Sequence, residues 1–160
     1  MNRIGFGSDT HRLVEGKKLI LGGVEISSDI GAEGHSDADA LAHAITDAML
    51  GALALGDIGS HFADTEERWR NADSFVFLRY AVGLIKEKGF AVVNVDTVVH
   101  LERPKLRPFI DEMRESLAIV LEIEANCISI KAKTGEGMDA VGERRAIKAE
   151  AIVLLEDDKI

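Results

Sequence analysis

HSDADALAHAITDAMLGALALG, residues 35–56, is the stretch that predicts the central element of the fold. Its apolar residues recur at the three- and four-residue spacing of a helix, at Leu41, Ile45, Ala48, Met49 and Ala52. Ser36 and Asp39 have the spacing of a capping box, with aspartate in place of the usual glutamate or glutamine, and Gly56 is typical of a helix end. Because the apolar face is lined by small residues, we expect this helix to pack closely against its neighbour.

Strand patterns lie on both sides of this helix. The clearest is residues 91–101, where one face of the alternating pattern holds Val93, Val95, Thr97, Val99 and Leu101. Further strands are predicted around Ile4-Gly5-Phe6 and over residues 17–26, 127–133 and 146–155. Gly22 and Gly23 interrupt the second strand and predict a bulge or a turn there.

Two more helices and a long loop complete the pattern. One helix is expected over residues 73–89 with Asp73 as its N-cap, and another ends near Leu121 after a start marked by two prolines. Residues 57–72 show no clean periodicity and predict a loop, which at this length is typical of a functional or mobile segment. The order β-β-α-α-β-α-β-β predicts an α+β fold, a ferredoxin-like sheet layered by helices, in a single domain over residues 1–160.

The composition argues against several classes of protein. The formal net charge of −9 at pH 7 argues against non-specific binding to nucleic acid, which depends on lysine and arginine. No apolar run is long enough for a membrane span and no leader pattern precedes the first strand, so we expect a cytoplasmic protein with no membrane partner. Cys127 is the only cysteine, so no intramolecular disulfide can form. If such an acidic protein binds a phosphorylated small molecule, we expect it to recruit divalent cations.

Asp9 and His11 form the first candidate pair of metal ligands. In a strand, residues two apart project from the same face, so the carboxylate and the imidazole lie together. Two ligands make a weak zinc site, and an isolated pair of this kind is more often an ordinary polar loop. His43, two turns into the predicted helix, would complete a three-ligand set with an open fourth position, although a lone histidine there is more often a core residue.

Several motifs together resemble one enzyme family. They are SDTH at 8–11, GHSDADALAHAITDAMLGALALGDIG at 34–59, FADT at 62–65, NADS at 71–74 and ERPKL at 102–106. The chain resembles the 2-C-methyl-D-erythritol 2,4-cyclodiphosphate synthases, the cyclases of the non-mevalonate isoprenoid pathway, over essentially its whole length. The resemblance implies a phosphorus–oxygen lyase that converts 4-diphosphocytidyl-2-C-methyl-D-erythritol 2-phosphate to the cyclic diphosphate and releases CMP. It also implies a homotrimer with active sites between neighbouring subunits.

The resemblance implies a role for individual residues as well. Zn²⁺ would be bound by Asp9, His11 and His43, and a second divalent cation, Mg²⁺ or Mn²⁺, by Glu136. The remaining site residues fall into three groups: phosphate contacts at His35 and Ser36, the methylerythritol pocket at Asp57 and Asp64, and the cytidine side at Pro104, Lys105, Ala132 and Thr134. Of these, His35 and Thr134 are expected to be catalytic. Backbone N–H groups at the helix start near His35 and Ser36 would add an anion site.

The same residues are also compatible with two other functions. If water rather than the substrate's own 2-phosphate were the nucleophile, the metal site would make the protein a phosphohydrolase. If the site catalysed no reaction, the protein would be a trimeric zinc-binding module.

The sequence also departs at Glu143 from the pattern that the resemblance implies, because many members of the family carry an arginine there that faces the trimer axis. If residues 143 and 144 lie in a strand, Arg144 points to the opposite face from residue 143 and cannot replace the missing arginine. The trimer axis would then lose its affinity for isoprenoid diphosphates.

Overall fold

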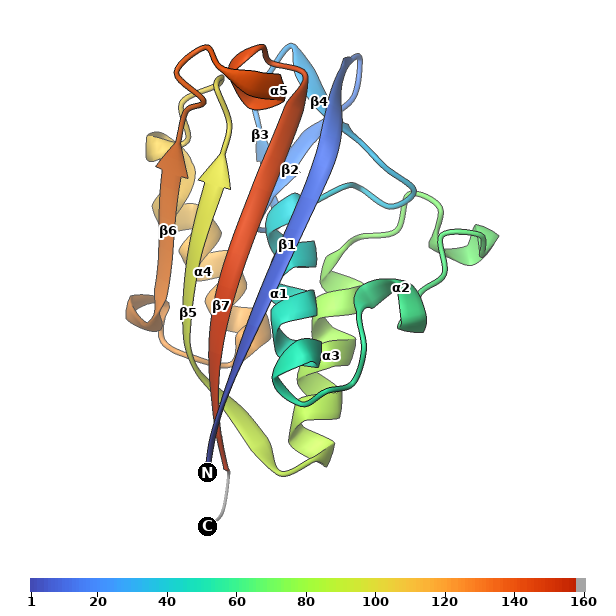
Figure 1. Ribbon diagram of the computed structural model, residues 1–160, viewed down its shortest axis with the longest axis vertical. Coiled ribbons are helices and arrows are strands. Elements are labelled where there is room, and N and C mark those ends of the chain that lie inside the picture. Colours follow the sequence, from blue (N-terminus) through green and yellow to red (C-terminus); the bar gives the residue numbers. More distant parts are fainter. Residues whose placement is uncertain (158–160) are drawn as a thin grey trace.

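The computed structural model describes residues 1–157 as one twisted sheet with helices on one face (Figure 1). The strands lie in the order β4-β1-β7-β5-β6. Their bounds are β1 (Asn2–Glu15), β4 (Ile30–Glu33), β5 (Phe90–His100), β6 (Ile128–Lys133) and β7 (Ala146–Asp157). The covering helices are α1 (Ala40–Ala52), α3 (Phe75–Glu87) and α4 (Ile110–Leu121). The predicted α+β sheet layered by helices is therefore confirmed.

The connectivity differs from the predicted ferredoxin-like arrangement. The core runs β1-α1-α3-β5-α4-β6-β7, whereas a ferredoxin-like fold runs β-α-β-β-α-β. β5 and β6 pair in parallel because α4 carries the chain back across the sheet between them, and all other neighbouring strands are antiparallel. The predicted strand at residues 17–26 is a separate hairpin, β2 (Leu19–Leu21) and β3 (Val24–Ile26), which turns at Gly22 and Gly23.

α1 packs directly on β1, as its small residues predicted. A Cβ atom on Gly5 would lie 1.7 Å from the carbonyl oxygen of Ala48, and one on Gly7 would lie 2.0 Å from that of Ala44. Only glycine allows the helix backbone to approach the strand so closely. This approach brings His43 on α1 beside the polar residues in the second half of β1.

α1 begins at Ala40, so the predicted start at Ser36 is wrong. The N-cap is Asp39, whose buried carboxylate accepts hydrogen bonds from the N–H groups of Ala42 and Gly22 at 3.0 Å and of Gly23 at 2.8 Å. Burial raises the pKa of Asp39 to about 6, although the three backbone bonds act in the opposite direction. Asp39 thus joins the β2–β3 turn to the first turn of α1.

Replacing Asp39 with alanine is expected to lower the free energy of unfolding by about 3 kcal/mol. The change removes a helix cap and leaves buried N–H groups without an acceptor. Denaturation in urea measures the loss. Asp57→Ala is the matched control, since Asp57 caps α2 (Ile58–His61) on the exposed surface and its loss should lower the free energy of unfolding less than the loss of Asp39 does. Equal losses for the two variants would contradict this role of Asp39.

The structure corrects three further details of the predicted elements. Residues 57–72 contain α2 and the 3-10 helix η1 (Glu67–Trp69) rather than only loop. α3 has Ser74 at its N-cap position, while Asp73 accepts from the N–H of Phe75 at 2.8 Å. In β5 a bulge leaves Val93 out of the ladder and buries Val92 in its place.

The connecting 3-10 helices are η2 (Arg107–Phe109) and η3 (Ala125–Cys127). Among residues 1–157, no helix has both the length and the apolar character to cross a membrane.

Glu143 and Arg144 do not lie in a strand, which removes the basis of the expectation about the trimer axis. They follow the short helix α5 (Asp139–Gly142), and Arg144 adopts a left-handed conformation with a φ of +60°. The Glu143 carboxylate pairs with Arg145 at 2.6 Å, and Arg144 pairs with Asp29 at 3.0 Å. A strand-face argument therefore cannot be applied to either residue.

Candidate metal centre and substrate cleft

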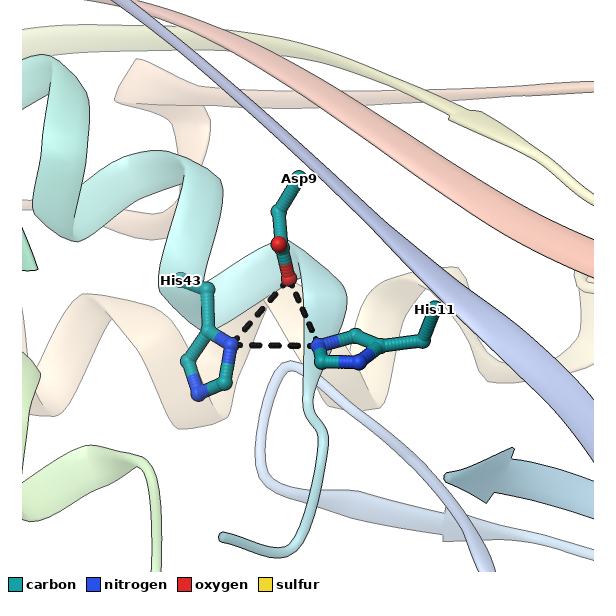
Figure 2. A group of neighbouring side chains, drawn as sticks. All are labelled: Asp9, His11 and His43. Carbon is teal, nitrogen blue, oxygen red and sulfur yellow. Dashed lines mark hydrogen bonds and ion pairs between the residues drawn. The ribbon is translucent and has the colours of Figure 1, made fainter. Parts of the chain in front are cut away.

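Asp9 and His11 on β1 meet His43 on α1 at one point, as Figure 2 shows. Asp9 Oδ2 lies 2.8 Å from His11 Nε2 and 3.1 Å from His43 Nδ1, and the two ring nitrogens are 3.3 Å apart. Strand periodicity places the first two side chains on the helix-covered face of β1, and the close packing of α1 supplies the third. The three-residue set that the family resemblance predicted is brought together in the structure.

Contacts on the far side of each ring orient the two imidazoles. The Nδ1–H of His11 donates to the carbonyl oxygen of Glu33 on β4 at 3.0 Å, which leaves Nε2 facing Asp9. His43 Nε2 lies 2.8 Å from the hydroxyl of Ser74, so its Nδ1 faces the same point. Such outer contacts are typical of histidines that bind metal ions.

The charges of the three side chains suit a cation. Burial would raise the pKa of Asp9, but hydrogen bonds from His11 and His43 outweigh it and lower that pKa well below its ordinary value. Burial lowers the pKa of His11, yet the hydrogen bond and charge of Asp9 raise it further, so the net shift is upward. One carboxylate oxygen and two imidazole nitrogens within 4.8 Å of one another form a donor set that fits Zn²⁺ with a fourth position free.

Zinc affinity is expected to fall as the pH is lowered, beginning above the ordinary histidine pKa of 6.5. The raised pKa means that the metal-free site holds a proton on His11 at higher pH, and zinc has to displace that proton. Below this pKa each pH unit should weaken binding about tenfold. Competition with a chelator between about pH 8 and about pH 6 measures the affinity. A constant affinity down to pH 6.5 would contradict the upward shift.

A cleft of about 420 Å³ opens beside the three residues. Its lining includes the predicted phosphate contacts His35 and Ser36 and the predicted pocket residue Asp64, together with His11 and His43. The other wall is apolar and aromatic, formed by Ile58, Gly59, Phe62, Ala63, Trp69 and Phe77.

Two expectations about this cleft change. His35 and Ser36 precede α1 by several residues, so their N–H groups do not belong to a helix start. Asp57 is exposed, lies outside the cleft lining and accepts from the N–H of Ser60 at 2.8 Å.

A second cleft, of about 380 Å³, lies between β6 and the start of α4. All four residues predicted for the cytidine side line it: Pro104, Lys105, Ala132 and Thr134. Glu136 is exposed just beyond it, and its carboxylate accepts from the Thr134 hydroxyl at 2.6 Å. The structure thus places most of the predicted site residues at two clefts, with Asp57 and Glu136 outside their linings.

Three supporting residues escaped the sequence analysis. Glu102 accepts from the N–H of Gly135 at 2.8 Å and holds the turn that carries Thr134 and Glu136. Asp37 and Ser74 lie behind His43. Ser74 belongs to the NADS motif and Glu102 to ERPKL, so the motifs contained a signal, but the spacing of the residues did not indicate these contacts.

A family model describes almost the whole chain. The model of the YgbB family matches residues 2–156. The chain belongs to the YgbB family.

Among curated relatives of this YgbB-family chain is the 2-C-methyl-D-erythritol 2,4-cyclodiphosphate synthase of Solibacter usitatus. It is 54% identical over 154 residues, which cover 96% of this chain and 97% of that protein. The synthase of Chlorobaculum tepidum is 51% identical over 155 residues, with 97% and 99% covered.

Solved structures agree with the YgbB assignment. A 2C-methyl-D-erythritol-2,4-cyclodiphosphate synthase in its CDP-bound form has a TM-score of 0.89 at 44% identity, with 96% of this chain and 100% of that chain covered. The Plasmodium falciparum enzyme in complex with CDP has a TM-score of 0.87 at 37% identity, with 99% and 97% covered. The resemblance predicted from the motifs, and with it the assignment to the cyclodiphosphate synthases of isoprenoid biosynthesis, is confirmed.

Proposed function

We propose that this chain, as one domain over residues 1–160, closes the ring of 2-C-methyl-D-erythritol 2,4-cyclodiphosphate. The 2-phosphate of 4-diphosphocytidyl-2-C-methyl-D-erythritol 2-phosphate attacks the β-phosphorus, and CMP leaves with the bridging oxygen. The observation that carries the proposal is the convergence of Asp9, His11 and His43 at a cleft that also holds His35 and Ser36, in a chain of this family.

The side chains of the first cleft suit this reaction. A phosphate monoester is already an anion near neutral pH, so no residue has to activate the nucleophile; the chain has to align the reacting groups and offset their charge. His35 and Ser36 would bind phosphate oxygens, and Asp64, together with Asp57 from outside the lining, would accept hydrogen bonds from the methylerythritol hydroxyls. Asp9, His11 and His43 would hold Zn²⁺, which when bound supplies a Lewis acid to a phosphate oxygen.

The second cleft would hold the cytidine end. Pro104 and Ala132 would pack on the nucleotide, and Lys105 would offset phosphate charge. The Thr134 hydroxyl would donate a hydrogen bond to the reacting diphosphate. Thr134 and His35 would be the catalytic residues. The structures of relatives with CDP bound support a cytidine nucleotide as the ligand.

Glu136→Gln is expected to raise the Mg²⁺ concentration needed for half-maximal turnover about tenfold and to leave the zinc content unchanged. The carboxylate would be the protein ligand of a second cation, Mg²⁺ or Mn²⁺, and its charge sets the affinity. A magnesium titration of CMP release measures the effect. Glu112→Gln, on α4, is a control of the same chemistry away from this turn. An unchanged titration for Glu136→Gln would remove this residue from the proposed cation site.

The face of the sheet that α1, α3 and α4 leave uncovered supports a homotrimer. On β1 and β7 this face exposes Ile4, Phe6 and Ile152, with 72%, 61% and 49% of their surfaces accessible. An exposed group of large apolar residues is typical of a protein–protein interface. We therefore propose that the uncovered face packs against the other subunits.

The positions of the two clefts support active sites between subunits. The metal ligands lie on β1 and α1, whereas Ala132 and Thr134 belong to β6 or directly follow it, and β7 and β5 separate the two strands. At the usual spacing of strands, β1 and β6 are roughly 14 Å apart. In a ring of three copies, one edge of each sheet meets the opposite edge of the neighbouring sheet. This arrangement brings the first cleft of one copy next to the second cleft of its neighbour.

The walls of the first cleft favour cyclisation over the alternative, metal-dependent hydrolysis. Phe62 packs against Phe77 and Trp69, with ring centroids 4.5 Å and 5.0 Å apart. The rings of Phe62 and Phe77 on this wall offer no hydrogen bond to an attacking water. A non-enzymatic zinc-binding module would not need the second cleft with its predicted cytidine residues.

CMP release tests the proposed function. The metal-free protein should release none above background, and zinc added to one equivalent per chain, in the presence of Mg²⁺, should restore release. Release that does not respond to zinc would contradict the proposal. The cytoplasmic location and the absence of nucleic acid and membrane partners stay predictions.

A further inference from the structure

Ser74 lies behind His43, on the side away from the metal ligands. The residue is fully buried at the start of α3. Its hydroxyl oxygen lies 2.8 Å from His43 Nε2 and forms a very short hydrogen bond with the carboxylate of Asp37. The three side chains form a line from Asp37 through Ser74 to His43.

The number of protons fixes the direction of these hydrogen bonds. A serine hydroxyl has one proton, and the carboxylate of Asp37 can only accept, so the Ser74 proton is donated to Asp37. The Ser74 oxygen can then serve His43 only as an acceptor. His43 therefore carries a proton on Nε2, and Nδ1, which faces Asp9 and His11, is the nitrogen left to bind a metal.

The backbone holds Asp37 in place for this task. Its carboxylate accepts from the N–H of Ser74 and from the N–H of Asp39, each at 3.2 Å. Its own N–H donates to the carbonyl oxygen of Ala72 at 2.9 Å. Hydrogen bonds thus join the segment before α1 to the segment before α3. They fix the position of the Ser74 hydroxyl oxygen, which accepts from His43.

We propose that Ser74 and Asp37 are positioning residues that hold His43 in the Nε2–H tautomer and present Nδ1 to the metal. The inference deepens the proposed function, because it concerns the same metal site. Outer-sphere partners of metal-binding histidines fix the tautomer and the ring orientation, and their loss typically lowers metal affinity 10- to 100-fold.

Ser74→Ala is the direct test. Ser74 makes no side-chain cap bond to α3, so the helix start does not depend on the hydroxyl. Nitrogen NMR should show a proton fully held on His43 Nε2 in the metal-free wild-type protein and only partly held there in Ser74→Ala. Chelator competition should show zinc bound about 10- to 100-fold more weakly by the variant. Asp37→Asn, which keeps an amide oxygen as acceptor, should show a smaller loss.

Ser36→Ala is the matched control. The Ser36 hydroxyl also lies near His43 Nε2, at the longer distance of 3.2 Å, and its proton is not committed to a carboxylate. This variant should keep the Nε2–H tautomer. An unchanged tautomer and an unchanged zinc affinity in Ser74→Ala would overturn the inference. Failure of the wild-type protein to bind zinc would instead overturn the proposed metal site, and the tautomer in the metal-free protein would still test the positioning role.

Discussion

Replacing His43 with alanine is expected to remove zinc from the purified protein and to lower kcat about a thousandfold. The site would fall to two protein ligands, Asp9 and His11, which is too few for a stable zinc site. The lost charge stabilisation of the transition state is of the order of 4 kcal/mol, which corresponds to that factor. Metal analysis and CMP release measure the two effects.

The variant should keep its fold and its assembly. Alanine is a strong helix former, and the His43 side chain lies at the cleft rather than in the apolar core. His61→Ala is the matched control, because His61 is a histidine outside the ligand group that contacts Leu55 and Tyr80. It should retain zinc. Full zinc occupancy in His43→Ala would remove this residue from the site.

Two inactive chains are expected to restore activity when they are mixed as subunits of one trimer. His43→Ala damages the first cleft, and Lys105→Glu reverses a charge in the second and should lower turnover about a hundredfold. If each active site combines the first cleft of one subunit with the second cleft of its neighbour, mixed trimers contain some sites with both halves intact. Random mixing of equal amounts should restore about a quarter of the wild-type activity.

The doubly substituted chain provides the control. A mixture of His43→Ala with the chain that carries both changes contains no site with an intact first cleft, so it should stay inactive. If each site instead lay within one chain, the mixture of single variants would recover nothing. Refolding the chains together, followed by a CMP-release assay, distinguishes the two arrangements.

Local rules predicted part of the ligand set from the sequence, and the family resemblance supplied the choice of His43. The alternation of β1 places Asp9 and His11 on one face, and the small residues of α1 together with Gly5 and Gly7 predict close contact between helix and strand. The contact between β1 and α1 then brings His43 to the other two ligands. The remaining site residues were predicted from motifs shared with a known family. The spacing of these residues does not indicate their roles.

The errors came from contacts between distant segments. Asp39 rather than Ser36 caps α1 because the β2–β3 turn supplies two N–H groups to its carboxylate, and no local pattern reveals that turn beside the helix. Ser74 is placed behind His43 by the link between Asp37 and the start of α3. The ferredoxin-like prediction failed because strand order in a sheet depends on which strands pair, and periodicity identifies strands without naming their partners.

Phosphorus NMR of the reaction products, formed in water enriched in heavy oxygen, distinguishes cyclisation from hydrolysis. The account predicts that 4-diphosphocytidyl-2-C-methyl-D-erythritol 2-phosphate yields a cyclic diphosphate and CMP, and that neither product carries heavy oxygen, because the attacking oxygen belongs to the substrate. Linear phosphates that carry heavy oxygen from the solvent would show hydrolysis and would contradict the account.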